Sequence, residues 1–244
     1  MDNPTARIEV QTDAGALATA VAGELLSRIA DAQASGAVPA ICLTGGSIAD
    51  AVHAEIGRLG ADSGVDWTAV DFWWGDERYV DLDSPDRLST AARAAFLDPL
   101  GVPEARIHEV PTPSPDRTMD EAARAYGEEL RAAPQHEFLV AMFGIGPDGH
   151  VASLFPGFPQ LHEHDEIAVA VTGSPKPPPE RISLTFDALN HAAATWFLVS
   201  GESKADAVRR ALADEGSVED TPARGLRGTP ETTWFLDQAA ASQI

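Results

Sequence analysis

The chain has 244 residues, of which 44% are hydrophobic and 23% are charged, a composition typical of a globular protein with a sizeable core. Its 17 Lys and Arg residues against 38 Asp and Glu residues give a net charge of −21, which argues against nucleic acid and anionic membrane as partners because both require a basic face. Cys42 is the only cysteine, which excludes a disulfide framework within the chain. Without a signal-peptide pattern or an apolar run of roughly 18 residues, we expect a cytoplasmic protein.

Helices and strands alternate along the predicted chain. Apolar residues recur every three or four positions over residues 14–34, which predicts an amphipathic helix. Strands are predicted at residues 8–10, 38–43, 70–74, 106–110, 138–143, 167–171, 181–185, 195–199 and 232–236. Further helices are predicted at residues 48–59, 89–97, 119–131, 187–191 and 204–213, with a short one at the C-terminus. The proline stretches lie in loops, so we expect a single domain over residues 1–244.

The most informative stretch is the glycine-rich loop at residues 144–157, which follows the apolar run of residues 138–143. In an open α/β sheet, the loop beyond the carboxyl end of a central strand is where ligands bind. The loop contains Asp148 and His150, two positions apart. An imidazole there can transfer protons near neutral pH, and a nearby carboxylate can hold its tautomer. From these residues alone, a plain turn with a surface histidine is the alternative.

A second turn, Thr44-Gly45-Gly46-Ser47, joins a predicted strand to a predicted helix. Free amides and the helix dipole make such a turn a cradle for an anion. The turn lacks both the P-loop signature and the three-glycine dinucleotide fingerprint, so a small phosphate ester fits better than a nucleotide. A tight turn without a ligand is equally compatible with the residues.

Charged residues near other strand ends are further candidates. Asp76 and Arg78 follow an aromatic strand, and Arg181 opens another; solvated surface charges are the alternative for all three. Lys204 is expected in the first turn of its helix, where a cation opposes the dipole and indicates a nearby anion. Lys176, in a proline stretch, is expected on a surface loop. The remaining histidines are interpreted as structural or solvated: His53, His108, His136, His162, His164 and His191.

Four separated segments together resemble the 6-phosphogluconolactonase family, within the superfamily of glucosamine-6-phosphate isomerases. They are Leu43-Thr44-Gly45-Gly46-Ser47, the Trp-Gly-Asp-Glu-Arg-Tyr-Val stretch at 74–80, the loop at 144–156, and residues 181–185 with Gly201-Glu202-Ser203-Lys204. The segments occur in the family's order across nearly the whole chain, and the Trp-Gly-Asp-Glu-Arg and Gly-Pro-Asp-Gly-His pieces are specific.

The resemblance implies an α/β fold, a three-layer αβα sandwich with a mostly parallel, Rossmann-like central sheet. It implies that the reaction takes place at His150, with Asp148 behind the imidazole. Asp76 and Arg78 would line the end of the site that holds the sugar. The substrate phosphate would be held by Gly45, Gly46, Ser47, Arg181 and Lys204. It further implies a small sugar-phosphate lactone as partner, no cofactor, no metal, and a monomer or weak homodimer.

Two places depart from the family pattern. Asp86-Arg87-Leu88 stands where family members carry an Asp-Ser-Asn-like triplet, so one expected polar contact is lost or moved. Ile48 and Ala49 follow the Gly-Gly-Ser turn in place of Thr and Pro.

One position separates the two activities of the superfamily. The isomerases carry a Glu five positions after the loop histidine, where it assists ring opening; here that position is Phe155. A phenyl ring cannot relay protons, so we expect hydrolysis of 6-phospho-D-glucono-1,5-lactone with His150 as general base. The alternatives are a glucosamine-6-phosphate isomerase or deaminase, and a non-catalytic sugar-phosphate sensor, which usually carries a basic DNA-binding segment.

Overall fold

A computed structural model describes residues 6–134, 137–227 and 230–244. Its centre is a six-stranded sheet with the order β1-β9-β8-β5-β2-β3, in which neighbouring strands run parallel. The strands are β1 (Arg7–Gln11), β2 (Ala40–Leu43), β3 (Asp71–Trp74), β5 (Val140–Phe143), β8 (Ala194–Val199) and β9 (Glu231–Asp237). The predicted parallel α/β sheet is confirmed.

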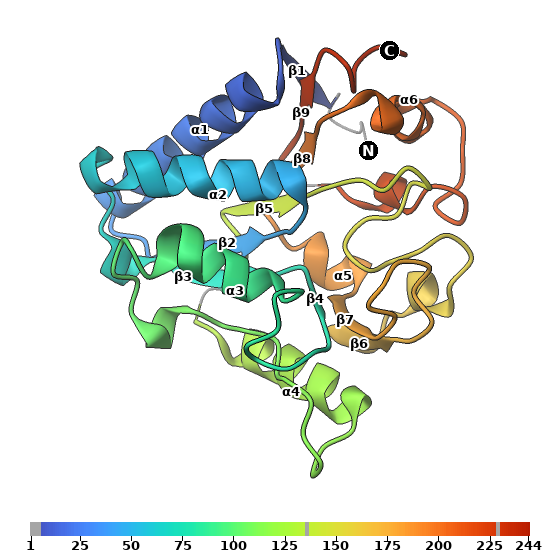
Figure 1. Ribbon diagram of the computed structural model, residues 1–244, viewed down its shortest axis with the longest axis horizontal. Coiled ribbons are helices and arrows are strands. Elements are labelled where there is room, and N and C mark those ends of the chain that lie inside the picture. Colours follow the sequence, from blue (N-terminus) through green and yellow to red (C-terminus); the bar gives the residue numbers. More distant parts are fainter. Residues whose placement is uncertain (1–5, 135–136, 228–229) are drawn as a thin grey trace.

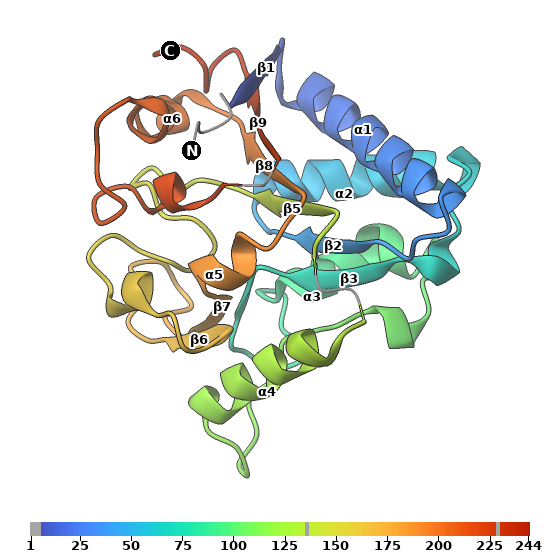
Figure 2. The same cartoon turned by 180° about the vertical axis from the view of Figure 1, so that it is seen from behind.

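Helices cover both faces of this sheet (Figures 1 and 2). One face packs against α1 (Ala14–Ala34), α2 (Ser47–Leu59) and α3 (Leu88–Ala92). The other packs against α4 (Met119–Ala132), α5 (Phe186–Leu189) and α6 (Ala205–Leu212). Because side chains alternate along a strand, β2 sends Ile41 and Leu43 into the first core and Cys42 into the second. Burial on both faces explains why the central strands read as continuous apolar runs.

A second, smaller sheet lies beside the central one. It is antiparallel, with the order β4-β7-β6, and consists of β4 (Asp76–Arg78), β7 (Arg181–Leu184) and β6 (Ala168–Val171). Gly75 joins the two sheets, since its N–H donates to Leu43 and its carbonyl accepts from Leu184. A Cβ at Gly75 would lie 3.2 Å from the Phe143 ring, so a larger residue would crowd this junction. Strand β4 was not predicted.

Two local predictions are wrong, and a third element is helical as predicted but with a changed hydrogen-bond pattern. Residues 106–110 form no regular strand, because a single bridge between Ile107 and Phe72 is followed by residues 108–110 outside any ladder. The chain after β9 forms turns at residues 238–243 in place of a helix. Helix α3 continues as a π-helix, Arg93–Leu97, so the predicted helix over 89–97 changes its hydrogen-bond pattern midway.

Short 3₁₀ turns complete the described chain: Gly60–Asp62, Trp67–Ala69, Glu104–Arg106, Pro159–His162, Glu202–Lys204 and Pro222–Gly225. Within the described ranges, none of the helices is both long enough and apolar enough to cross a membrane.

Candidate active site

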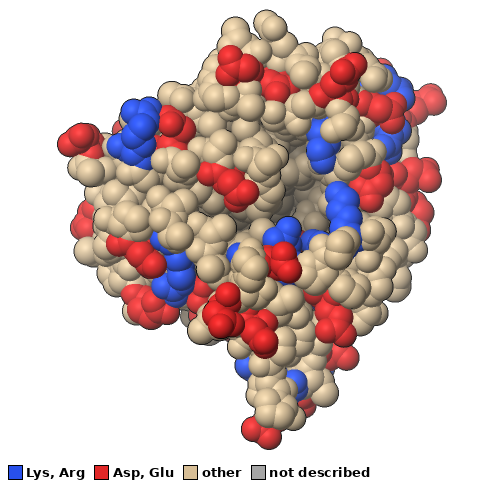
Figure 3. Space-filling view, viewed as in Figure 1, with Lys and Arg blue, Asp and Glu red and all other residues tan. Residues whose placement is uncertain are grey.

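A pocket opens between the two sheets, beyond the carboxyl ends of β2 and β5. Figure 3 shows a hollow on this face with Lys and Arg side chains around it. The lining residues are Thr44, Gly45, Gly46, Asp76, Arg78, Leu88, Gly144, Ile145, Gly146, His150, Ala152, Lys176, Arg181 and Lys204. Four cations against one carboxylate therefore face this pocket in a chain whose net charge is −21. Such a local excess favours an anionic ligand.

The turn after β2 supplies backbone to the pocket. Gly46 has a φ of 105°, a conformation that L side chains rarely adopt, and it precedes α2. A Cβ at Gly45 would lie 2.1 Å from a Leu88 methyl carbon. The first helical hydrogen bond runs from the Asp50 N–H to the Gly46 carbonyl, which leaves the preceding amides of α2 outside the helical ladder. Ser47 begins α2, but it is exposed and is not among the residues that line the pocket.

The loop after β5 brings Asp148 and His150 into contact. Asp148 Oδ1 lies 2.5 Å from His150 Nδ1, so the carboxylate accepts the Nδ1–H and leaves Nε2 with the lone pair. Burial opposes ionisation of Asp148, but the hydrogen bond and charge of His150 outweigh it and lower the pKa of Asp148 to about 2. Gly146 is required here, because a Cβ would lie 2.0 Å from the imidazole. Asp148 itself lies behind the ring, outside the pocket lining.

The small sheet contributes a buried ion pair. Asp76, 6% exposed, accepts a hydrogen bond from Ser153 Oγ at 2.6 Å, and its Oδ2 lies 3.8 Å from Arg181 Nη1. Arg181 is 5% exposed and donates from Nε to the Pro178 carbonyl and from Nη2 to the Lys176 carbonyl. Its guanidinium therefore both shapes the proline loop and presents Nη1 near the pocket.

The departure at residues 86–88 is accommodated by backbone contacts. Glu77 is fully buried and accepts hydrogen bonds from the backbone N–H groups of Arg78, Leu88 and Ser89. Arg78 donates from Nη1 to the Asp86 carbonyl at 2.5 Å, and its Nε is buried without a protein partner. The Leu88 side chain covers Gly45, so an apolar wall replaces the missing polar contact.

Both lysines of the chain face the pocket. Lys204 was expected in the first turn of its helix; it is instead the last residue of a 3₁₀ turn and the N-cap of α6, one residue before the helix begins. Its Nζ donates to the Ile145 carbonyl at 2.8 Å. The proline stretch is the surface loop that was expected, and Lys176 lines the pocket from it. Burial lowers the pKa of both ammonium groups, and the charge of Lys176 lowers the pKa of Lys204 further.

Sequence reasoning missed Lys176, Thr44 and Ala152 among the lining residues. Lys176 could have been found from its position in the proline-rich loop just before Arg181. A loop that short keeps its side chains near Arg181, which was itself a predicted site residue. Ala152 has a positive φ of 48°, which marks a constrained turn that no local pattern predicted.

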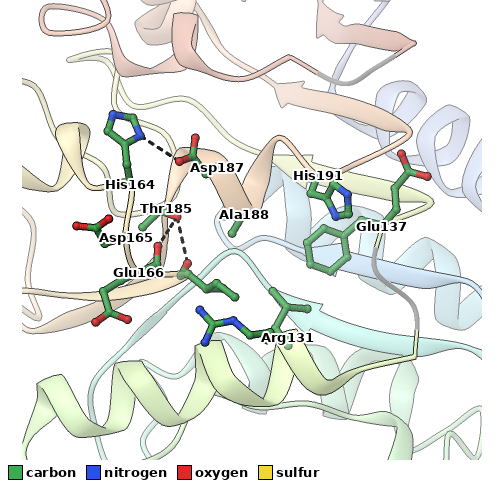
Figure 4. Close-up of a pocket in the computed structure, with 12 residues that line it drawn as sticks. Arg131, Glu137, His164, Asp165, Glu166, Thr185, Asp187, Ala188 and His191 are labelled. Atoms are coloured by element: carbon green, nitrogen blue, oxygen red, sulfur yellow. Dashed lines mark hydrogen bonds and ion pairs between the residues drawn. The ribbon is translucent and has the colours of Figure 1, made fainter.

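A larger pocket lies elsewhere, between α4, α5 and β6, and it shares no lining residue with the first (Figure 4). Its labelled side chains include four carboxylates, Glu137, Asp165, Glu166 and Asp187, against the single guanidinium of Arg131. His164 is already paired with Asp187 at 3.0 Å. A phosphate ester would be repelled from this pocket, so the candidate active site is the smaller one.

The chain matches the family model described as glucosamine-6-phosphate isomerases/6-phosphogluconolactonase over residues 12–234. It is 41% identical to the 6-phosphogluconolactonase of Streptomyces coelicolor, over 98% of this chain and 95% of that protein. It is 36% identical to the human 6-phosphogluconolactonase, over 83% and 79% of the two chains.

Solved structures agree with the fold. The 6-phosphogluconolactonase of Thermotoga maritima superposes with a TM-score of 0.83 at 26% identity, over 95% of this chain and 99% of that one. A monomeric glucosamine-6-phosphate deaminase superposes with a TM-score of 0.79 at 19% identity, which shows the shared fold alone. The resemblance read from the sequence is confirmed, and the chain belongs to the glucosamine-6-phosphate isomerase/6-phosphogluconolactonase family.

Proposed function

We propose that this protein hydrolyses 6-phospho-D-glucono-1,5-lactone to 6-phospho-D-gluconate, with His150 as general base and without a metal ion. The observation that carries the proposal is the Asp148–His150 pair, 2.5 Å apart, at the edge of a pocket with four cations. The relatives named 6-phosphogluconolactonase, which match nearly the whole chain, support the same activity.

The phosphate is held at the end of the pocket where β2 and α2 meet. The amides of Gly45, Gly46 and Ser47 supply hydrogen-bond donors at a helix N-terminus, where the dipole favours negative charge. Lys204 and Arg181 add positive charge, and both line the pocket. In this arrangement the lactone ring extends toward His150, with Asp76 and Arg78 beside the sugar.

His150 then performs the proton transfers. Its Nε2 removes a proton from a water molecule as the water oxygen attacks C1 of the lactone. The resulting oxyanion is stabilised by the guanidinium of Arg78. When the C1–O5 bond breaks, the imidazolium returns the proton to the ring oxygen, and the new carboxylic acid loses its own proton to solvent. Asp148 stabilises the imidazolium throughout.

A lactone is an activated ester, so attack by water needs only a base and charge stabilisation. The isomerase reaction requires a further proton relay for ring opening. Phe155 is fully buried and its ring centroid lies 4.6 Å from that of His150, so the position of the isomerase Glu is occupied by a group that only packs against the base.

The direct test is the disappearance of 6-phospho-D-glucono-1,5-lactone at about pH 6.5, with ammonia release from glucosamine 6-phosphate measured on the same preparation. We expect lactone hydrolysis above the spontaneous rate and no ammonia. Ammonia release without lactonase activity would reverse the assignment. Activity on neither substrate would favour a sensor of sugar phosphates.

A further inference from the structure

The loop that carries Asp148 and His150 is held from its outer side by Arg210 of α6. Arg210 Nη2 donates to the Pro147 carbonyl at 2.8 Å, one residue before Asp148. Nη1 donates to Thr221 Oγ1 at 2.8 Å, and Nε donates to Asp206 Oδ2 at 2.9 Å. One planar guanidinium thus connects its own helix, the loop after β5 and the segment near residue 221.

The same segment also holds the other side of Asp148. The Ala223 N–H donates to the Gly149 carbonyl at 3.0 Å. Thr221 is 3% exposed, and a Cβ on Gly149 would lie 3.0 Å from its Cγ2 and 3.2 Å from Arg210 Nη1. The carbonyl groups of Pro147 and Gly149, the residues on either side of Asp148, therefore accept hydrogen bonds from groups more than sixty residues later in the chain.

We propose that Arg210 is a positioning residue for the reaction, which keeps the Asp148 carboxylate against His150 Nδ1. Arg210 does not line the pocket, so it acts through the loop and makes no contact with substrate. A misplacement of about 1 Å at a catalytic group can lower the rate roughly 10²-fold. Loss of the hydrogen bond to the Pro147 carbonyl is therefore expected to lower kcat. The inference rests on the proposed role of His150 as general base.

The adjacent residue provides a matched control. Arg209 lies on the same helix, and its Nη2 donates to Asp206 Oδ1 at 2.6 Å, so both arginines pair with the same carboxylate. The Arg209 side chain is 50% exposed, and no described residue of the loop forms a hydrogen bond or ion pair with it. Arg209→Met and Arg210→Met therefore each remove one positive charge and one ion pair with Asp206. Only Arg210→Met also removes the hydrogen bond to the Pro147 carbonyl.

The experiment measures lactonase kinetics and the downfield proton resonance of the His150 Nδ1–H, assigned by its absence in His150→Ala. We expect Arg210→Met to lower kcat by roughly 10- to 100-fold, with KM within about twofold, and to weaken or abolish the downfield resonance. Arg209→Met should keep both kcat and the resonance. Arg210→Lys should recover only part of kcat, because an ammonium lacks the fork that reaches Pro147 and Thr221 together.

Equal kcat values for the two Met variants, or a retained resonance in Arg210→Met, would overturn the proposal. If Arg210→Met does not fold, Thr221→Val removes the nearer of the two acceptors of Nη1, the other being the Asp220 carbonyl at 3.4 Å, and it should lower kcat by a few-fold; an unchanged kcat would overturn the inference. A wild-type protein without lactonase activity would instead defeat the proposed function, while the resonance would still report whether Arg210 holds the pair.

Discussion

The two sheets contribute to the pocket in different ways. The large parallel sheet presents backbone groups through the turn after β2 and the Asp148–His150 pair through the loop after β5. The small antiparallel sheet presents charged side chains: Asp76 and Arg78 on β4, and Arg181 on β7 opposite Arg78, with Asp76 and Arg181 buried. On the small-sheet side, Lys176 enters from the loop before β7.

This difference shows why the site needs both sheets. A parallel sheet places its strand ends at one edge, where loops rich in glycine can approach a ligand closely. The two strands that lead into the pocket, β2 and β5, are apolar throughout, so they do not themselves supply cations. The small sheet has polar residues within its strands and keeps them buried by pairing Asp76 with Arg181. The large sheet therefore orients the chemistry, and the small sheet adds charge for the anion.

The largest expected effect is on the large-sheet side, at the base. His150→Ala should lower kcat by roughly 10²–10⁴-fold, the usual contribution of a positioned general base, with a modest change in KM. Asp148→Asn should have a milder or comparable effect, because it removes the group that orients the ring. Steady-state kinetics on the phosphorylated lactone measures both effects. If the kcat of His150→Ala stays within a few-fold of the wild-type value, another residue is the base.

A second prediction concerns the helix that covers the large sheet. His53 on α2 is 2% exposed, neither ring nitrogen has a hydrogen-bond partner, and burial lowers its pKa to about 4. The unfolded chain binds a proton near pH 6.5 and the folded chain does not, so stability falls as the pH drops from 6.5 toward 4. His53 should account for about 2 kcal/mol of the loss between pH 7 and pH 5.

Urea unfolding at the two pH values checks this. His53→Leu should show a smaller loss than wild type by about that amount, whereas His191→Gln, at an exposed position, should keep the wild-type loss. If His53→Leu and wild type lose equal stability, the acid sensitivity arises from other groups.

A third, smaller effect compares the two lysines, one from each side of the pocket. Loss of a cation from a desolvated pair costs about 2–5 kcal/mol, and Lys204 is half-buried against the Ile145 carbonyl. Lys204→Ala should narrow the preference for the phosphorylated lactone over glucono-lactone by at least about tenfold, equivalent to roughly 1.4 kcal/mol. Lys176→Ala should change the same substrate ratio in the same direction, but by less. No described residue holds the Lys176 ammonium in place with a hydrogen bond, whereas the Ile145 carbonyl holds that of Lys204.

The ratio of kcat/KM for the two substrates measures both lysine effects. Arg58→Ala is the control for net charge, since Arg58 is exposed near the opposite end of α2 from the turn. If Lys204→Ala lowers the rate on both lactones equally, Lys204 supports the fold or the chemistry and does not bind phosphate.

The last prediction is that removal of metal ions has no effect on activity. We expect dialysis against EDTA to leave turnover unchanged, because the proposed mechanism uses only side chains and amides from the two regions. If chelation abolishes activity and zinc or magnesium restores it, Asp148 and His150 act as metal ligands and the general-base mechanism is wrong.

Much of the site could be predicted because its parts are close together in the sequence. Asp148 and His150 are two positions apart in a loop whose preceding strand is a plain apolar run, and the Gly45-Gly46 turn follows another. Ser47 belongs to the same turn, but it is exposed and is not among the residues that line the pocket. The substitution at Leu88 was visible in the sequence, but its consequence was not, because the contact it makes with Gly45 crosses about forty residues.

The sequence by itself determined the parallel α/β class, the two glycine turns and the residue types that carry the chemistry, since each depends on local periodicity or on glycine's backbone freedom. Only the tertiary structure decided that β4 pairs with β7, that Lys176 enters the pocket and that Arg210 holds the loop of Asp148. The pairing of β4 with β7 joins residues more than 100 positions apart, the contact of Arg210 with Pro147 joins residues 63 positions apart, and Lys176 shares the pocket with residues as far away in the chain as Thr44. Local patterns carry no information about such pairing, because its free energy comes from burial and hydrogen bonds that exist only after the chain has folded.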